Sequence, residues 1–248
     1  MAVSMMFKVP GFAYPGGKVR LRKWLVSMMP REGGRYVEPF AGRGNVFWLA
    51  ACCLKFQEWW LNDIYTKPFF DAIRDVDVAD IPIKLTVEDV RAHIKARDIL
   101  GLLLETRCGF SGGIGNCINH KANRNFNSRG YTIEIQNAKR ILKRVTPTIT
   151  SVDWKTTFDS LDEHDFMYLD PPYMDSMAGY AVDTVDHEEL LHALAQTNVR
   201  WLLSGYETTL YQKIIGKPFA GIPSAITMAS TRRGVAKSIR TECVWRNY

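Results

Sequence analysis

Apolar and polar positions along the first third of the chain predict alternating helices and strands. Four apolar residues between positions 21 and 28 recur at helical spacing on one face. Residues 35–37 predict a short buried strand, and a glycine-bearing turn at 38–45 leads into a helix predicted at 46–55. A second buried strand is predicted at 59–61. The order strand, glycine turn, helix, strand is that of an open α/β sheet.

The same alternation returns after position 150. The run 166–169 predicts a buried strand, and Asp186 with Glu189 three residues later predicts the N-terminal cap of a helix at 187–196. The remaining predicted elements are a strand at 199–204, a helix at 208–215 and a strand at 243–248 that closes the sheet. The whole pattern predicts an α/β fold with a Rossmann-like sheet and helices on both faces.

The segment 84–150 departs from this alternation. Thr86 and Asp89 predict a helix cap, and the helix they begin is expected to run through 100–107 with its apolar side chains inward. A stretch rich in Gly and Asn, 109–130, predicts a loop or hairpin, and another helix is expected from about Thr132. The inward positions of the first helix are Val90, Ile94, Leu102 and Leu103.

Residues 1–83 and 151–248 are therefore expected to form one domain, interrupted by a mainly helical lobe at 84–150. The chain of 248 residues with 46% apolar content is long enough for one core that carries such a lobe. The net positive charge is concentrated in the lobe, which has twelve Lys or Arg and five Asp or Glu, whereas the rest has 20 basic and 21 acidic residues. A local positive excess of this size favours a polyanionic partner over simple solubility.

Composition also excludes several classes of protein. No apolar window is long enough to span a membrane, and no leader-like segment is evident at the start. The five cysteines are odd in number and lack C-x-x-C spacing, which fits a reduced, cytoplasmic setting without structural zinc. The five histidines form no ligand set and are interpreted as surface residues.

The strongest chemical candidate is Asp170-Pro171-Pro172-Tyr173, directly after the predicted strand at 166–169. A carboxylate and a backbone carbonyl on a rigid proline corner can accept both N–H groups of an aromatic amine, and the tyrosine ring can stack on a flat base. The alternative is a turn after a buried strand, in which Asp170 caps the turn and Pro172 ends it. The polar segment 174–182 is expected to form a loop that closes over the site.

The turn at 38–45 holds two glycines preceded by Glu38. A carboxylate there repels phosphates and favours a ligand with cationic groups, such as S-adenosylmethionine. Asp63, about twenty residues beyond the turn, is positioned to accept hydrogen bonds from ribose hydroxyls, although a helix cap fits its spacing nearly as well. Lys18 after Gly16-Gly17 can meet a carboxylate, and a loop that enters a helix is the simpler explanation.

The runs Y-P-G-G-K at 14–18, E-P-F-A-G-R-G-N at 38–45, L-N-D at 61–63 and D-P-P-Y at 170–173 together resemble the Dam-type (D12 class) N6-adenine DNA methyltransferases, several of which belong to bacteriophages and restriction systems. Tyr14-Pro15 stands where many members have Trp-Ala, and Asn45 where Ser is common. The resemblance implies cofactor contacts at Tyr14, Lys18, Glu38, Phe40, Gly42, Asp63, Asp153, Trp154 and Asp170. It also implies catalysis by Asp170, Pro171, Pro172 and Tyr173.

This resemblance implies methyl transfer from S-adenosylmethionine to adenine N6 in double-stranded DNA, with the base flipped out of the helix. The protein would act without metal in the cytoplasm of a bacterial cell or phage-infected host, as a monomer or weak dimer on DNA, and a partner restriction nuclease fits the family. Residues 84–150 would form the target-recognition lobe. Expected DNA contacts are Lys121, Arg124, Arg129, Lys139, Arg140, Arg232 and Arg233.

Other functions fit parts of the same pattern. RNA adenine and DNA cytosine-N4 methyltransferases use similar chemistry at a similar corner. A DNA-binding protein of this fold without catalysis is a further alternative, which the presence of Lys18, Asp63, Asp170 and Tyr173 disfavours. A nicotinamide oxidoreductase is disfavoured by Glu38 and by the missing third glycine of the turn.

Overall fold

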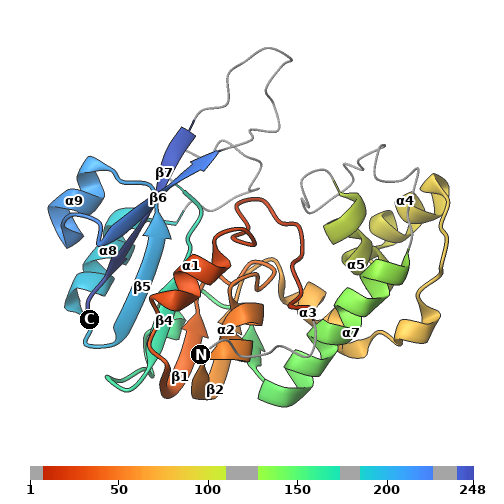
Figure 1. The fold of residues 1–248 in the computed structure, drawn as a ribbon, viewed down its shortest axis with the longest axis horizontal. Helices are drawn as coiled ribbons and strands as arrows, with labels where there is room; N and C mark the ends of the chain where they lie inside the picture. Colours follow the sequence, from red (N-terminus) through yellow and green to blue (C-terminus); the bar gives the residue numbers. More distant parts are fainter. Residues whose placement is uncertain (1–7, 110–127, 174–184, 226–238) are drawn as a thin grey trace.

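A seven-stranded sheet forms the centre of the computed structural model, which describes residues 8–109, 128–173, 185–225 and 239–248 (Figure 1). The strands lie in the order β3-β2-β1-β4-β5-β7-β6. Their bounds are Glu32–Glu38 (β1), Lys55–Asn62 (β2), Thr148–Thr150 (β3), Phe166–Leu169 (β4), Arg200–Gly205 (β5), Ala220–Ala225 (β6) and Ile239–Arg246 (β7).

The order of strands reverses at β1, which pairs with β2 on one side and β4 on the other. The pairs among β1 to β5 are parallel, whereas β7 runs antiparallel to both β5 and β6. Ligands of open α/β sheets bind beyond the carboxyl ends of the strands at such a reversal. The crevice expected from topology therefore lies where Glu38 ends β1 and Asp170 follows β4.

Both faces of the sheet are covered, because alternate residues of a strand point to opposite sides. In β4, Phe166 and Tyr168 pack into one hydrophobic core, while Met167 and Leu169 pack into a second. Helices α1 (Arg22–Ser27), α2 (Phe47–Cys53) and α3 (Lys67–Asp75) supply the first core, and α8 (His187–Gln196) and α9 (Thr209–Ile215) supply the second. The predicted α/β class with helices on both faces is confirmed.

The segment 84–150 contains α4 (Val87–Ala96), α5 (Ile99–Cys108) and α7 (Ser128–Val145), which gather at the end of the molecule opposite α8 and α9 (Figure 1). Thr86 and Asp89 form the predicted capping box. Apolar side chains of these helices belong to the same core as those of α1 to α3. The division of the chain into a catalytic domain and a recognition lobe stays a prediction.

The prediction of a single helix from Thr86 to Arg107 was wrong, because the helix is interrupted between α4 and α5. Arg97 adopts a left-handed conformation with φ of 51°, which ends α4. Asp98 then caps the next helix by accepting a hydrogen bond from the Gly101 N–H. A second helix axis results, and Val90, Ile94 and Leu103 are buried as expected, whereas Leu102 is only partly buried.

Two short helices complete the described chain. The short helices η1 (Val78–Asp80) and η3 (Trp154–Thr157) follow α3 and β3, respectively. The edge strands β3 and β6 were not predicted, and β7 lies between β5 and β6 instead of closing the sheet. None of the helices in the described ranges is both long and apolar enough to cross a membrane.

Candidate active site

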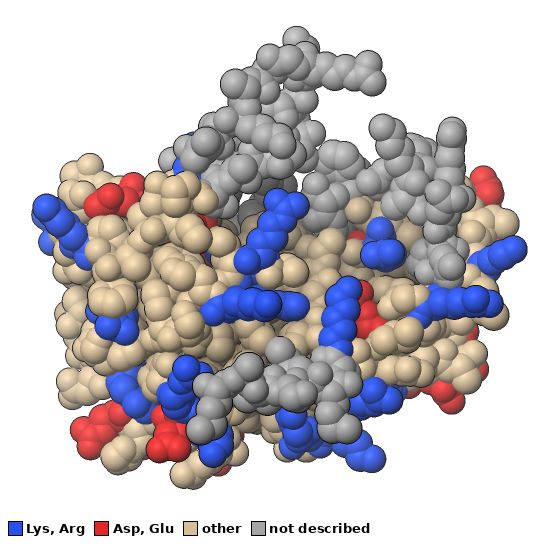
Figure 2. Space-filling view, viewed as in Figure 1, with Lys and Arg blue, Asp and Glu red and all other residues tan. Residues whose placement is uncertain are grey.

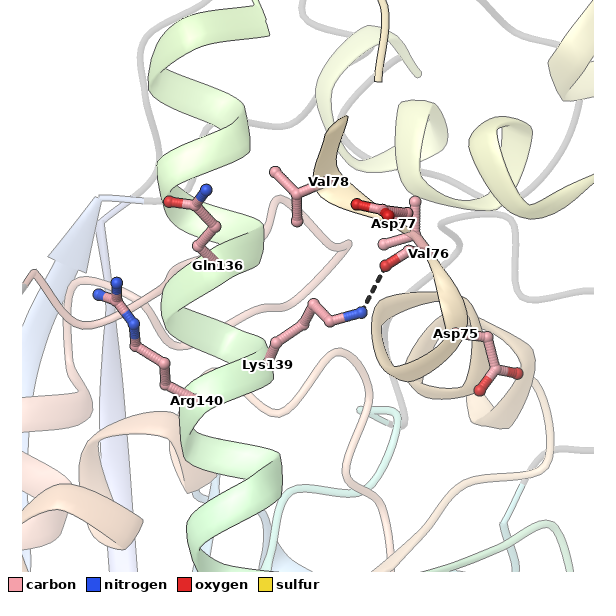
Figure 3. A pocket seen from close by; sticks show the side chains of 7 residues that line it. All are labelled: Asp75, Val76, Asp77, Val78, Gln136, Lys139 and Arg140. Carbon is pink, nitrogen blue, oxygen red and sulfur yellow. Dashed lines mark hydrogen bonds between the residues drawn. The ribbon is translucent and has the colours of Figure 1, made fainter. Parts of the chain in front are cut away.

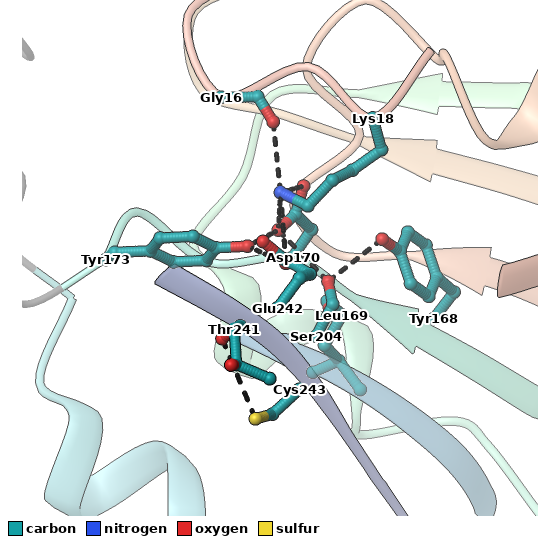
Figure 4. A network of polar contacts seen from close by, with 10 residues as sticks. All are labelled: Gly16, Lys18, Tyr168, Leu169, Asp170, Tyr173, Ser204, Thr241, Glu242 and Cys243. Atoms are coloured by element: carbon teal, nitrogen blue, oxygen red, sulfur yellow. Dashed lines mark hydrogen bonds and ion pairs between the residues drawn. The ribbon is translucent and has the colours of Figure 1, made fainter. Parts of the chain in front are cut away.

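The polar network beyond β4 begins with an ion pair between the two halves of the chain (Figure 4). Lys18 lies in the loop before α1, and its Nζ is 2.7 Å from Asp170 Oδ1 and 2.9 Å from Oδ2. The same ammonium donates to the Gly16 carbonyl at 3.0 Å. Lys18 is only 6% exposed, and a buried ammonium requires a counter-ion. The pair therefore fixes the N-terminal loop against the corner after β4.

Asp170 also accepts hydrogen bonds from neighbouring elements. Ser204 Oγ, at the end of β5, lies 3.1 Å from Asp170 Oδ1, and the Tyr173 hydroxyl lies 3.2 Å from the same oxygen. Ser204 is in turn 2.9 Å from the Tyr168 hydroxyl on β4. A carboxylate offers about four acceptor positions, and the contacts from Lys18, Ser204 and Tyr173 occupy about that number, most of them on Oδ1.

His187 braces the proline corner, although the sequence placed it at the surface. The side chain is buried at 7% exposure, and its Nε2 lies 2.8 Å from the Pro172 carbonyl. Burial lowers the pKa of His187, which favours the neutral ring. Because a carbonyl only accepts, Nε2 donates to Pro172, and Nδ1 accepts from the Tyr211 hydroxyl at 2.9 Å. The surface prediction for His187 was wrong because this residue links α8, α9 and the corner.

Glu242, on β7, is a second buried carboxylate in the network and was not predicted. It is 3% exposed, accepts a hydrogen bond from the Tyr173 hydroxyl, and has Oε1 3.7 Å from Lys18 Nζ. Lys18 Nζ also lies 4.7 Å from the centre of the Tyr173 ring. The signal in the sequence was weak. Alternation along the strand places Glu242 on the side opposite to the apolar Cys243 and Trp245, and both faces of the sheet are covered.

Glu38 lies at the end of β1, near enough to Asp170 for their charges to interact. It is 2% exposed and accepts a hydrogen bond of 2.6 Å from the Tyr36 hydroxyl. Burial raises the pKa of Glu38 to about 8, and the charge of Asp170 acts in the same direction, while hydrogen bonds from Tyr36 and the Phe47 N–H partly offset them. A buried carboxyl of this kind is stabilised in its charged form by an incoming cation.

The glycine turn after β1 is held by Asp63. The Gly42 N–H donates to Asp63 Oδ2 at 2.9 Å, and Oδ1 accepts from the N–H groups of Tyr65 and Thr66, each at 2.9 Å. Gly42 has a φ of +52°, and a Cβ there would lie 3.0 Å from the ring of Tyr14. Asp63 thus serves the turn before α3, and its expected contact with a ribose stays a prediction.

Two aromatic residues, Phe40 after β1 and Trp154 in η3, lie near each other. The ring centres of Phe40 and Trp154 lie 6.4 Å apart. Asp153 Oδ1 accepts a hydrogen bond of 2.9 Å from the Lys155 N–H and caps η3. This contact fits the simpler interpretation of Asp153 as a turn residue, and a role for Asp153 and Trp154 beside a cofactor adenine stays a prediction.

The structure thus brings the predicted residues together in three adjoining groups. Lys18, Asp170 and Tyr173 are in direct contact. The other groups join Tyr14, Gly42 and Asp63 at the glycine turn, and Phe40 with Trp154.

The expected DNA-binding residues are only partly described. Lys121, Arg124, Arg232 and Arg233 lie outside the described residues, as do the loops expected at 174–182 and over most of 109–130. Arg129 and Arg140 are exposed on α7. Lys139 Nζ instead donates to the carbonyls of Arg74, at 2.8 Å, and Val76, at the end of α3 (Figure 3).

This part of α7 borders an open pocket of about 570 Å³ between α3 and α7 (Figure 3). Across the face shown in Figure 2, Lys and Arg side chains run through the middle, and Asp and Glu lie mostly towards the margins. Within the described ranges, no group of three or more His, Cys, Asp or Glu side chains could hold a metal ion. The lining residues of the pocket are Asp75, Val76, Asp77, Val78, Gln136, Lys139 and Arg140.

A seven-stranded α/β sheet with one reversed strand, and acidic side chains at the point where its order reverses, is the architecture of Rossmann-like methyltransferases. The family model of the D12 class N6 adenine-specific DNA methyltransferases matches residues 14–79. The match covers about a quarter of the chain and shows that residues 14–79 are similar to this family. A comparison with curated proteins found no match. The corner at Asp170 lies outside the matched residues, and its role rests on the geometry described above.

Proposed function

We propose that this protein transfers a methyl group from S-adenosylmethionine to N6 of an adenine flipped out of duplex DNA into the corner formed by Asp170 and Tyr173. The observation that carries the proposal is the pair between Lys18 and Asp170, at 2.7 Å. It joins the loop that leads to the family-matched glycine turn with the one corner whose acceptors suit an exocyclic amine.

The residues of the crevice fit the cofactor. S-adenosylmethionine supplies an electrophilic methyl group on a positively charged sulfonium, beside an ammonium and a carboxylate. Among the described residues, no cation lowers the pKa of the buried Glu38 carboxyl, so an ammonium there is favourable. A Cβ at Gly42 would lie 3.0 Å from the Tyr14 ring, so the turn favours glycine. Asp63, which accepts a hydrogen bond from the Gly42 N–H, is proposed to bind the ribose hydroxyls.

Asp170 and Pro171 are proposed to activate the target amine. The lone pair of the adenine amino nitrogen is shared with the ring, which makes the nitrogen a poor nucleophile. Hydrogen bonds from its two N–H groups to the Asp170 carboxylate and the Pro171 carbonyl draw the nitrogen towards tetrahedral geometry. These bonds strengthen as positive charge develops on nitrogen, so they stabilise the transition state more than the ground state.

Tyr173 and His187 are proposed to hold the base and the corner in place. The Tyr173 ring offers a surface on which a flipped base can stack. His187 fixes the Pro172 carbonyl through a buried hydrogen bond of 2.8 Å, so the neighbouring Pro171 carbonyl is presented from a rigid support. Flipping costs a few kcal/mol, which contacts with the protein must offset.

Basic residues of α7 are proposed to contact the DNA backbone. Arg129 and Arg140 are exposed, and the segment 84–150 carries the net positive charge of the chain. Contacts of this kind position the duplex without reading its sequence. The ammonium of the partly buried Lys139 is bound by carbonyls at the end of α3, so this residue is left out of the proposed contacts.

The decisive experiment compares Asp170→Asn with the wild type in a methyl-transfer assay with labelled cofactor and duplex DNA. The wild type is expected to yield N6-methyladenine on nucleoside analysis. The variant keeps the shape of the side chain but loses its charge, so transfer should fall at least about 10³-fold. DNA binding should be retained, and a melting curve checks that the variant is folded.

Exposed Asp159 provides the matched control, and Asp159→Asn should transfer methyl groups at the wild-type rate. Product found as N4-methylcytosine, or transfer to RNA alone, would replace the proposed substrate with one of the alternatives. Unchanged transfer by Asp170→Asn would remove Asp170 from the mechanism.

A further inference from the structure

Glu242 is enclosed by the residues proposed to carry out the reaction. Glu242 belongs to β7, the strand next to β5, and lies 69 residues beyond Tyr173 in the chain. Its carboxylate receives the Tyr173 hydroxyl and lies 3.7 Å from Lys18 Nζ, with only 4% of its side chain exposed (Figure 4). A buried carboxylate is costly unless it is paired, so its presence beside Asp170 requires a reason.

The proposed reaction gives Asp170 two conflicting tasks. In the structure, both of its oxygens accept hydrogen bonds from Lys18, at 2.7 and 2.9 Å. During methyl transfer, one of these oxygens must accept an N–H of the adenine amine instead. Lys18 would then lose part of its partner while still buried, which is unfavourable for an ammonium in a poorly solvated site.

Glu242 removes this conflict because it is a second anion within reach of the same ammonium. A shift of Lys18 Nζ by less than 1 Å would change the 3.7 Å contact into a hydrogen bond of ordinary length. The Tyr173 hydroxyl lies between the two carboxylates, 3.2 Å from Asp170 Oδ1 and hydrogen-bonded to Glu242. Release of Asp170 and orientation of Tyr173 therefore involve the same residue.

We propose that Glu242 is a positioning residue for methyl transfer, which takes over Lys18 and anchors the Tyr173 hydroxyl so that Asp170 can turn one oxygen to the target amine. The inference rests on the proposed function and names a residue of the same site that neither the sequence motifs nor the family match includes.

This role makes the rate dependent on the charge of Glu242. Burial raises the pKa of Glu242, and the charge of Asp170 acts in the same direction, while Lys18 and the hydrogen bond from Tyr173 oppose it. Tyr168 and Tyr206 also face it. A protonated Glu242 cannot pair with Lys18. The rate of transfer should therefore fall with decreasing pH, and the fall should begin at a higher pH than for an ordinary carboxyl.

The test is single-turnover methyl transfer by Glu242→Gln across a range of pH, together with cofactor binding by calorimetry. Glutamine keeps the acceptor for Tyr173 but not the charge. The expected result is a rate about 10- to 100-fold below wild type at neutral pH, cofactor affinity within about threefold, and loss of the acidic limb of the pH profile. The exposed Glu207, which bonds Gln212 at 2.7 Å, supplies the control Glu207→Gln, for which no change is expected.

Glu242→Asp separates charge from structure and carries the test if Glu242→Gln does not fold. Aspartate keeps the counter-charge but is too short for the Tyr173 contact, so the acidic limb should persist while the rate drops. A Glu242→Gln enzyme with the wild-type rate and pH profile would overturn the inference, and so would an equal loss of cofactor binding and turnover. If the wild type itself transfers no methyl group, the proposed function fails. A change confined to the Glu242 variants bears on the role of Glu242 alone.

Discussion

At the scale of single residues, the site combines acids that are buried to different degrees around one lysine. Asp170 is paired with Lys18 at 2.7 Å, Glu242 lies within 3.7 Å of the same ammonium, and Glu38 has Tyr36 as its hydrogen-bond partner. Without ligands, negative charge therefore exceeds positive charge in the crevice if every group ionises. The raised pKa values of Glu38 and Glu242 reflect this excess and their burial.

Glu38 gives a prediction for pH dependence. Its pKa of about 8 in the folded protein is above the ordinary value of 4.5, so the folded state binds more protons than the unfolded state between these values. Stability should therefore fall as pH rises from about 4.5 to 8, and Glu38→Gln should remove this part of the slope. Thermal melting of both proteins across that range measures the difference.

Cofactor binding should release the proton of the Glu38 carboxyl. If the ammonium of the cofactor contacts Glu38, binding at pH 7 favours the charged carboxylate and should release close to one proton, roughly 0.9 by the pKa of about 8. Calorimetry in two buffers of different ionisation enthalpy measures this release. Glu58, exposed on β2, is the control position, and Glu58→Gln should release as many protons as wild type. Equal release by Glu38→Gln would contradict the proposed ammonium contact.

At the scale of elements, a buried ion pair connects the glycine turn to helix α5. Arg43 lies between Gly42 and Gly44, and its side chain is 1% exposed. Its Nη2 is 3.5 Å from Glu105 Oε2 on α5, and its Nη1 donates to the Ala13 carbonyl at 2.6 Å. The turn proposed to hold the cofactor is therefore joined to the segment proposed to contact DNA.

Loss of the Arg43–Glu105 pair should strongly lower the free energy of unfolding. Glu105→Ala leaves Arg43 buried without its carboxylate and should lower the free energy of unfolding by about 3–5 kcal/mol, as measured by urea denaturation. Arg97 contacts the other oxygen of Glu105 at 3.2 Å but is 46% exposed. Arg97→Ala should therefore cost less than about 1 kcal/mol. Similar costs for the two variants would show that the buried pair contributes no more than an exposed one.

The elements were predictable where local signals agreed. The capping residues Thr86 and Asp186 were identified correctly because a cap depends only on neighbours in sequence. The break at Arg97 was missed, since a left-handed arginine carries no sequence signature of the kind a glycine gives. Strand β6 was missed because its apolar character is low and β7 supplies its pairing from a distance.

At the scale of the whole molecule, the site exists only because distant parts of the chain meet. Lys18 and Asp170 are separated by 152 positions, and the sheet order places their elements next to each other. The motifs predicted that both halves of the chain contribute to one site, but they assigned Lys18 to the cofactor and not to Asp170. They could not predict His187 or Glu242, whose roles depend on the packing of α8 and β7 against the corner, which no short pattern records.

The distribution of charge over the molecule gives the last prediction. Arg140 and Lys139 are neighbours on α7, but only Lys139 has its charged group bound to carbonyls at the end of α3. Arg140→Gln should weaken DNA binding to a similar extent for all sequences, and the slope of log affinity against log salt should become shallower by about 0.9, as for one lost phosphate contact. Lys139→Gln should leave this slope unchanged and lower the melting temperature instead. Fluorescence anisotropy at several salt concentrations measures both variants, and a reversed pattern would assign the phosphate contact to Lys139.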